Sequence, residues 1–175
     1  RIAPFPPLSN VADKAARAPG NVALSGAKAL TAGHQLVYSL CRPPGHHAER
    51  DTYGGFCYFC NGAIAAQFLV ESVGKVAVLD VDYHHGNGTQ DIFYADGSVM
   101  YVSMHEWPLY PGTGRLTDAG TGAGAGTTLN FPLPAGAPGH VYPAATARLA
   151  RPPPARRPPP RGPGSPGSPA PRPHA

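Results

Sequence analysis

A polar cluster follows a short apolar run near the middle of the sequence. Residues 76–79 are all apolar, and residues 80–88 read Asp-Val-Asp-Tyr-His-His-Gly-Asn-Gly. If the extended backbone continues past residue 79, Asp80, Asp82 and His84 are spaced by two and their side chains share one side. Carboxylate and imidazole together suit a borderline divalent ion such as zinc. A carboxylate at the end of an apolar strand is costly unless something binds it, which favours a ligand site over a solvated loop.

Two adjacent histidines form a second candidate site. His46 and His47 follow Pro43-Pro44-Gly45 in a loop. Imidazoles titrate near neutral pH, so a pair beside a metal-bound water could supply the general base and the general acid of a hydrolysis. Asp80 or another carboxylate could orient one of the rings. Tandem histidines alone are more often surface residues, so this interpretation depends on the polar cluster.

The elements around these residues alternate between helix and strand. Such alternation predicts an α/β fold of three layers with a mainly parallel sheet, in which the carboxyl ends of the strands line the ligand crevice. Residues 1–20 hold four prolines and no clear period, which predicts a loop or the broken end of an element. Helices are expected over 21–35, 61–74, 89–96 and 140–150, and strands over 36–40, 76–79, 99–104 and 127–134.

Two of these elements carry more specific expectations. Ile64, Phe68 and Leu69 lie on one face of the helix expected over 61–74, and Gly74 suits its C-cap. The continuous apolar run 76–79 is typical of a strand buried on both faces of a parallel sheet.

Composition divides the chain at about residue 143. Residues 1–143 hold eight basic and ten acidic residues, a net charge of −2, whereas residues 144–175 carry +6. Residues 151–175 contain 11 of the 23 prolines and no Val, Ile, Leu, Met, Phe, Trp, Tyr or Cys. We interpret 1–143 as part of a folded domain. Residues 144–175 are either a disordered polyproline-rich basic tail or the product of a shifted reading frame, and the interruption of a helix favours the second.

The remaining composition narrows the class of protein. The sequence contains no run of 18 apolar residues, so no membrane span is predicted. The start at Arg1 shows no secretory signal. Three cysteines are too few for a disulfide framework. We expect a soluble cytoplasmic protein. Residues 144–175 hold six arginines and no aromatic residues between them. This composition predicts at most unspecific, salt-sensitive binding to nucleic acid or membrane.

Six motifs together resemble the histone deacetylase superfamily, which includes the acetylpolyamine amidohydrolases and has the arginase/deacetylase fold. They extend in order over roughly residues 20–145, which makes chance a poor explanation. The motifs are Arg-Pro-Pro-Gly-His-His-Ala at 42–48, Gly-Phe-Cys-Tyr-Phe at 55–59, Leu-Asp-Val-Asp-Tyr-His-His-Gly-Asn-Gly-Thr-Gln at 79–90, Val-Ser-Met-His at 102–105, Tyr-Pro-Gly-Thr-Gly at 110–114 and Gly-Ala-Gly-Ala-Gly-Thr-Thr-Leu-Asn-Phe-Pro at 122–132.

The resemblance implies a zinc-dependent deacetylase that hydrolyses the amide of an acetylated lysine in proteins or of an acetylated polyamine. It implies that Asp82 and His84 bind zinc, that His46 and His47 act on the zinc-bound water, and that Asp80 supports His46. Residues implied for the substrate channel are Gly55, Phe56 and Tyr110, and main-chain groups implied for a structural potassium ion belong to Asp80, Asp82, His84, Ser103 and Met104.

The chain departs from the family pattern at two functional groups. The family's third zinc ligand, an aspartate, and its carbonyl-polarising tyrosine come from the C-terminal half, and no acidic residue follows Asp118 here. A catalytic zinc normally has three protein ligands, so we expect impaired hydrolysis. The alternatives are a catalytically inactive fragment or a module that binds an acyl ligand. An arginase-like two-metal hydrolase would need further metal carboxylates than the sequence supplies.

Overall fold

The computed structural model of the chain describes residues 10–149, and the predictions for residues 1–9 and 150–175 lie outside this range. The chain divides into a first unit that ends at Gly139 and a second that begins at His140. Within the second unit, helix α4 spans Val141–Leu149, as the sequence predicts. No helix in the described range is both long and apolar enough to cross a membrane.

Helix α1 begins much earlier than the sequence predicts. It spans Asn10–Thr31 and contains Pro19, so the loop prediction is wrong for residues 10–20. Ala16, Ala23 and Ala27 are buried along one face of this helix, which packs against α2. Proline removes one helical hydrogen bond, but the small residues on either side of it let α1 lie close to its neighbour. Tertiary packing therefore outweighs the local break.

Helix α2 matches its predicted range but buries a different face. It spans Asn61–Val73 and ends at Gly74, whose φ of 89° is the left-handed conformation that glycine adopts readily. The buried positions are Asn61, Ala63 and Ala66, whereas Ile64 remains 36% exposed. The predicted apolar face was therefore wrong. Small side chains lie where the helix approaches the rest of the molecule most closely.

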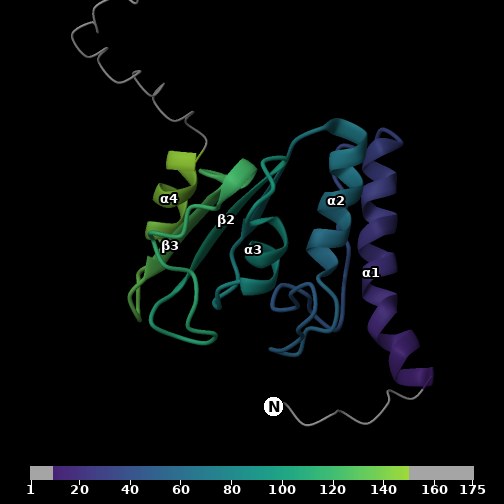
Figure 1. Cartoon of the computed structure of the whole chain (residues 1–175), viewed down its shortest axis with the longest axis horizontal. Coiled ribbons are helices and arrows are strands. Elements are labelled where there is room, and N and C mark those ends of the chain that lie inside the picture. The colour runs from purple at the N-terminus through teal and green to yellow at the C-terminus, as the bar shows by residue number, and fades with distance from the viewer. Residues whose placement is uncertain (1–9, 150–175) are drawn as a thin grey trace, which may run out of the picture. The chain divides into compact units, whose positions relative to one another are not determined.

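Three parallel strands form the sheet, which confirms the predicted α/β class. They are β1 (Val76–Asp80), β2 (Val99–Glu106) and β3 (Thr128–Leu133), in the order β1-β2-β3. Helix α3 (Asn87–Phe93) connects β1 to β2, and α1 and α2 lie side by side next to the β1 end of the sheet (Figure 1). The register pairs Asp80 with Ser103, so the polar residues after β1 lie beside the end of β2.

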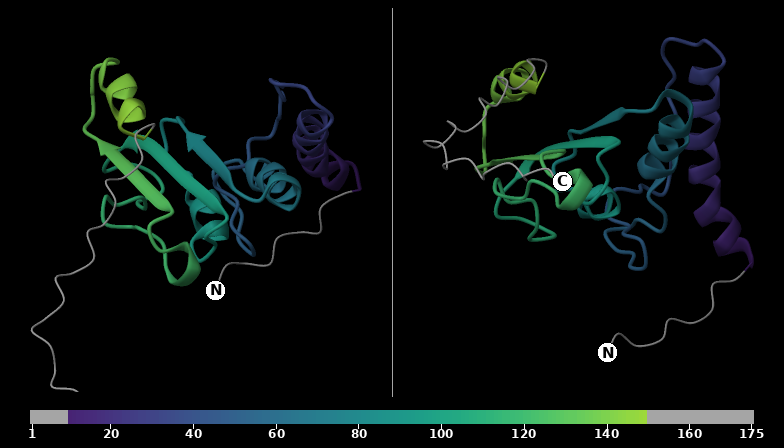
Figure 2. Two further views of the ribbon diagram at one scale, coloured as in Figure 1. Left: turned by 90° about the horizontal axis from the view of Figure 1, so that it is seen from above. Right: turned by 45° about the horizontal axis from the view of Figure 1, so that its top comes forward.

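The strands differ in how fully they are covered. In β2, residues 101–105 are all buried, whereas β1 alternates between half-buried and exposed residues, with Leu79 47% exposed. The prediction that 76–79 is buried on both faces is therefore wrong, because one face of β1 has no layer over it among the described residues. Views of the first unit from two further directions show the helices α1 and α2 gathered at one side of the strands (Figure 2).

The predicted strand at 36–40 is also not formed. These residues belong to no helix or strand, and no sheet partner lies beside them in the described part of the chain. The hydrophobic core of the first unit instead lies between α2, α3 and the strands, and consists of Ala48, Cys57, Cys60, Ala63, Ala66, Phe93 and Val99.

Candidate active site

The loop that carries the two histidines is fixed to the start of helix α3. The N–H groups of Gly88 and Thr89 both donate to the carbonyl oxygen of His46, at 2.9 and 3.2 Å. First-turn amides of a helix have no partner within the helix, so this carbonyl satisfies two of them. The chain segments that carry the two sequence motifs are thereby joined at the main chain.

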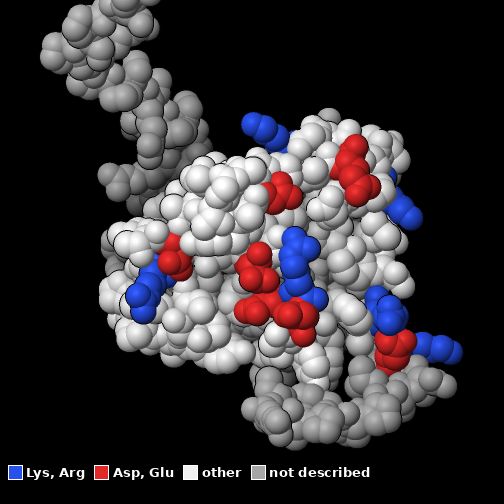
Figure 3. Space-filling model, viewed as in Figure 1, with Lys and Arg blue, Asp and Glu red and all other residues white. Residues whose placement is uncertain are grey.

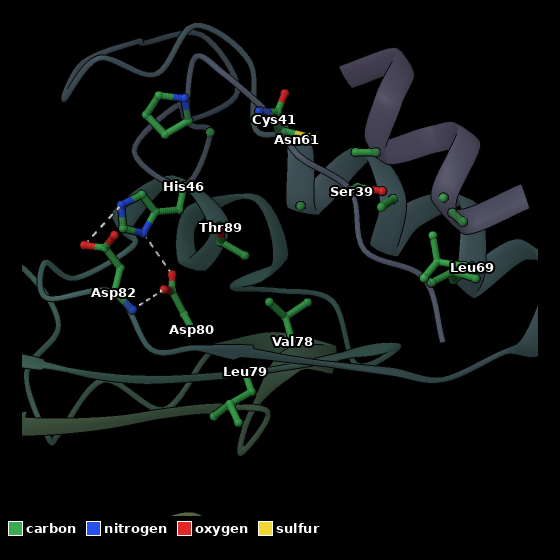
Figure 4. Close-up of a pocket in the computed structure, with 18 of the residues that line it drawn as sticks. Ser39, Cys41, His46, Asn61, Leu69, Val78, Leu79, Asp80, Asp82 and Thr89 are labelled. Carbon is green, nitrogen blue, oxygen red and sulfur yellow. Dashed lines mark hydrogen bonds and ion pairs between the residues drawn. The ribbon is translucent and has the colours of Figure 1, made fainter. Parts of the chain in front are cut away.

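His46 is held by a carboxylate from the end of β1. Its Nδ1 lies 3.0 Å from Oδ2 of Asp80, and the hydroxyl of Tyr101 donates to the same oxygen at 3.1 Å. The second carboxylate oxygen of Asp80 accepts the N–H of Asp82 at 3.2 Å. Figure 4 shows the His46, Asp80 and Asp82 side chains grouped at the end of the strand. Sequence reasoning missed Tyr101, which lies in register with Val78 of β1.

His47 has a different partner, which sequence reasoning also missed. Its Nδ1 lies 2.8 Å from Oδ1 of Asn87, and Nδ2 of Asn87 donates to a carboxylate oxygen of Glu49 at 2.7 Å. Because the Asn87 amide nitrogen faces Glu49, its oxygen faces the ring and accepts the Nδ1–H of His47. His47 is therefore the tautomer whose Nε2 carries the lone pair.

The environments of the two histidines shift their pKa values in opposite directions. Burial lowers the pKa of His46, but the hydrogen bond and charge of Asp80, together with the charge of Asp82, outweigh it and leave the pKa above 6.5. Burial lowers the pKa of His47, and the nearby His46 lowers it further against the Asn87 hydrogen bond. Two titratable groups with opposite shifts are a common arrangement of an acid and a base.

The candidate metal donors lie beside this pair. Asp82 Oδ1 is 3.6 Å from His84 Nδ1 and 3.9 Å from His46 Nε2. Both side chains are partly exposed, at 51% for Asp82 and 39% for His84. Carboxylate oxygen and imidazole nitrogen are suitable zinc donors. However, no group of three or more His, Cys, Asp or Glu residues in the described range is arranged to hold a metal ion, so these residues fit only part of a zinc site.

A cavity of about 490 Å³ opens onto these side chains. The Tyr110 ring meets the His47 ring edge to face at 5.0 Å, and Phe56 is 88% exposed at the cavity. Gly55 and Phe56 both have positive φ, and a Cβ at Gly55 would collide with the His47 ring. The turn therefore requires glycine at 55 and presents an aromatic side chain at 56. The lining residues are Pro44, His46, His47, Gly55, Phe56, Asp82, His84 and Tyr110.

His85, which follows the candidate metal ligand His84 in the sequence, is buried. It is 1% exposed, with Nδ1 2.8 Å from the Thr113 hydroxyl and Nε2 3.1 Å from the Gln90 side-chain oxygen. The oxygen can only accept, so the Nε2–H of His85 donates to it. Burial and the nearby His105 lower the pKa of His85 to about 4.

His105 packs against His85, with ring centroids 4.7 Å apart. Its Nε2–H donates to the Gly114 carbonyl at 3.0 Å, and its Nδ1 lies 2.9 Å from the Ser103 hydroxyl. Gly114 has a φ of 88°, and a Cβ there would collide with both rings. The contacts with Gly114 hold the end of the 107–114 loop against the His105 ring, which indicates a packing role for His105 in the described structure.

Cys57 and Cys60 do not form a reactive pair. Both are free and buried, and burial raises the pKa of each thiol. A raised pKa keeps the thiol protonated and unreactive at neutral pH. Their positions in the core agree with a structural role.

Comparisons with known proteins relate residues 4–157 to the family model described as the histone deacetylase domain. Over 124 residues, 69% of this chain, the sequence is 51% identical to acetylpolyamine amidohydrolase of Mycoplana ramosa. Over 103 residues, 58% of this chain, it is 48% identical to the chloroplastic histone deacetylase 10 of Oryza sativa subsp. japonica. The match covers 36% and 23% of these relatives, so the chain spans about a third or less of their length.

A solved structure gives the same relationship. The crystal structure of acetylpolyamine aminohydrolase from Burkholderia pseudomallei superimposes with a TM-score of 0.76 at 44% sequence identity. The superposition covers 78% of this chain and 41% of that chain. The three-stranded parallel sheet with its helices is therefore an incomplete version of the deacetylase architecture.

Proposed function

This chain belongs to the histone deacetylase family, and on that premise we propose that it contains the histidine pair and part of the zinc site of an amidohydrolase that removes acetyl groups from amines. The observation that supports this most is the convergence of His46, His47, Asp82 and His84 on one cavity. Residues from two separate loops meet there, and His46 and His47 are hydrogen-bonded to different partners, Asp80 and Asn87.

Asp82 and His84 would hold the zinc ion together with a third ligand that the described residues do not supply. When bound, zinc supplies Lewis acidity, which favours attack of water on an amide carbonyl. Asp82 receives the N–H of His84 on Oδ1 at 2.8 Å, and this bond orients the carboxylate toward the histidine side of the cavity.

The two histidines would divide the proton transfers. His47, whose Nδ1–H is held by Asn87, takes a proton from the attacking water on Nε2. The water oxygen bonds to the carbonyl carbon, and the carbon–nitrogen bond then breaks. His46, whose Nδ1 is hydrogen-bonded to Asp80, would donate a proton from Nε2 to the departing amine. The lowered pKa of His47 and the raised pKa of His46 support this assignment.

The aromatic residues at the cavity would select the substrate. Phe56 and Tyr110 have flat apolar faces that suit a methylene chain, and their rings would exclude water around the amide. Gly55 holds Phe56 in this position. We propose an acetylated lysine of a protein or an acetylated polyamine as the substrate.

A structural potassium ion would bind main-chain groups at the ends of β1 and β2. The register that pairs Asp80 with Ser103 supports this proposal, since it brings these two segments together. The groups would come from Asp80, Asp82, His84, Ser103 and Met104.

Hydrolysis by the 175-residue chain alone is expected to be impaired, because two zinc donors bind the ion less tightly than three. The second candidate function, an acyl-ligand-binding module without catalysis, follows from the same incomplete donor set. We propose no specific nucleic-acid partner, because the sequence predicts only unspecific, salt-sensitive binding. On the face shown in Figure 3, Lys and Arg side chains lie apart or beside acidic ones and form no basic surface.

Zinc titration with an activity assay tests the proposal. We expect the chain to bind zinc in isothermal titration calorimetry and to lose at least tenfold in affinity in Asp82→Ala and in His84→Ala. Glu71→Ala, an exposed carboxylate on α2, serves as the matched control and should bind as the parent does. Hydrolysis of a fluorogenic acetyl-lysine substrate and of N-acetylputrescine is measured in parallel.

Equal zinc affinity in all four proteins would contradict the metal assignment. Zinc-dependent turnover near that of a complete amidohydrolase would contradict the expected impairment.

A further inference from the structure

The side chain of Asn87 lies between a ring and a carboxylate that come from one loop. Its Oδ1 is 2.8 Å from Nδ1 of His47, and its Nδ2 donates to Oε1 of Glu49 at 2.7 Å. The same nitrogen lies 3.5 Å from the carbonyl oxygen of His47. A reversed amide would place Oδ1 of Asn87 against two oxygens that only accept hydrogen bonds, so these contacts permit a single orientation of the amide.

The main chain fixes Glu49 in this position. Its N–H donates to the carbonyl oxygen of Thr52 at 2.8 Å, which ties together the two ends of the segment 49–52. Asn87 is the first residue of α3, and Arg50 donates from Nη2 to the carbonyl oxygen of Ile92, near the end of the same helix, at 2.8 Å. The loop is therefore attached to α3 on both sides of the Glu49 side chain, which keeps the carboxylate beside Asn87.

Glu49 lies outside the cavity that contains the proposed reaction. The residues that line that cavity include His47 but not Glu49. Glu49 is half-buried and lines a separate cavity of about 820 Å³, together with residues of α2 that include Glu71. The effect of Glu49 on His47 therefore passes through the Asn87 amide.

An amide between a carboxylate and a ring transmits orientation without transferring a proton. The Asn87 side chain does not take up a proton from His47 at neutral pH, whereas the carboxylate of Asp80 contacts His46 directly. The pKa values differ accordingly, because burial lowers the pKa of His47 while that of His46 lies above 6.5. Glu49 thus orients its histidine without placing a negative charge against the ring.

We infer that Glu49 is a positioning residue that sets the tautomer of His47. Through Asn87 it keeps the ring proton on Nδ1 and the lone pair on Nε2, the atom that would accept the proton of the attacking water. This catalytic consequence rests on the proposed function. The tautomer itself does not, because it follows from the contacts with Asn87.

Substitutions at Glu49 separate its acceptor oxygen from its charge. Glu49→Gln removes the charge but keeps a side-chain oxygen that can accept from Asn87. Glu49→Lys presents only donors, so the Asn87 amide should reverse and direct its N–H groups at Nδ1 of His47. Glu71→Lys is the matched control, since Glu71 is an exposed carboxylate at the same outer cavity and the change of charge is identical.

Long-range proton–nitrogen correlation NMR of the 175-residue chain, treated with EDTA, identifies which ring nitrogen of His47 carries the proton. At about pH 8, where an ordinary histidine is neutral, the parent, Glu49→Gln and Glu71→Lys should hold it on Nδ1. In Glu49→Lys the ratio of the two tautomers should shift toward Nε2–H by about tenfold or more. Glu49→Ala, which removes the acceptor without adding a charge, should shift the ratio in the same direction by a smaller factor.

Circular dichroism identifies the variants that are folded, and Glu49→Ala provides the test if the lysine variant is not. An unchanged tautomer in the folded Glu49→Lys or Glu49→Ala variant would overturn the proposal. A parent chain with the His47 proton on Nε2 would also overturn it. An equal shift in Glu49→Gln or in Glu71→Lys would do the same, because the cause would then be charge and not the acceptor oxygen.

Zinc titration calorimetry on the same proteins separates this inference from the proposed function. A parent chain without zinc affinity, combined with the expected tautomer shift, would retain the role of Glu49 and contradict the proposed function. Zinc binding without the tautomer shift would retain the metal assignment and overturn the role of Glu49.

Discussion

Two pairs of histidines lie close together in this molecule and have opposite surroundings. The rings of His46 and His47 are 4.0 Å apart at a cavity, and those of His85 and His105 are 4.7 Å apart in the interior. The first pair has a carboxylate partner, Asp80, and lines a cavity that opens to solvent. The second has hydroxyl, amide and carbonyl partners and is sealed. Ring proximity is therefore common to both pairs, and what distinguishes His46 and His47 is a carboxylate partner and access to a cavity.

The largest effect should come from removing a ring of the sealed pair. His105→Ala leaves a cavity and deprives Ser103 and the Gly114 carbonyl of their partner, so we expect a loss of about 4 kcal/mol in the free energy of unfolding. His84→Ala at the open site should lose less than about 1 kcal/mol, because its side chain is 39% exposed. Urea denaturation measures both, and equal losses would remove the distinction between the pairs.

Acidification should lower the free energy of unfolding through His85, a member of the buried pair. The pKa of His85 is about 4 in the folded protein, against 6.5 for an unperturbed histidine, so the unfolded chain binds more protons between these values. The free energy of unfolding is then fully retained above pH 6.5 and falls on the order of 3 kcal/mol as the pH drops to 4.

Denaturation curves at several pH values measure this loss. His85→Gln, which cannot gain a proton, should flatten the dependence over this window. An unchanged slope in that variant would assign the pH dependence to other groups.

Asp80→Asn should have the smallest effect on the structure. It is the most direct test of what sets the pKa of His46 in the exposed pair. The substitution removes the carboxylate that keeps the pKa of His46 raised, so the pKa of His46 should fall. The pKa of His85 should remain low, because burial is its main cause. Nuclear magnetic resonance titration of the ring protons measures both. A His46 pKa that stays raised would show that Asp80 is not its cause.

Local sequence patterns predicted most of the fold. The apolar runs at 76–79 and 99–104 predicted β1 and β2, although only β2 is largely buried. The start of α1 was not predictable in this way, since Pro19 signals a break that packing against α2 overrides. Residues 36–40 have a strand sequence without a strand partner in the described structure, and sequence alone cannot show whether a partner is present.

The site was predictable to a different extent. The spacing of Asp80, Asp82 and His84 indicated a shared site, and the structure places Asp80 beside His46. The bond between His47 and Asn87 joins residues 40 positions apart, and no local pattern signals it. The contrast between the two histidine pairs was likewise not predictable, because burial depends on loops far along the chain.

The two hydrogen bonds from Gly88 and Thr89 to the His46 carbonyl have a consequence for protein engineering. A designer who transplants the histidine loop onto another scaffold would move its side chains without the helix start that fixes its backbone. Residues 42–48 alone would therefore not keep their backbone conformation on another scaffold. Any graft of the histidine pair has to transfer α3 together with the loop.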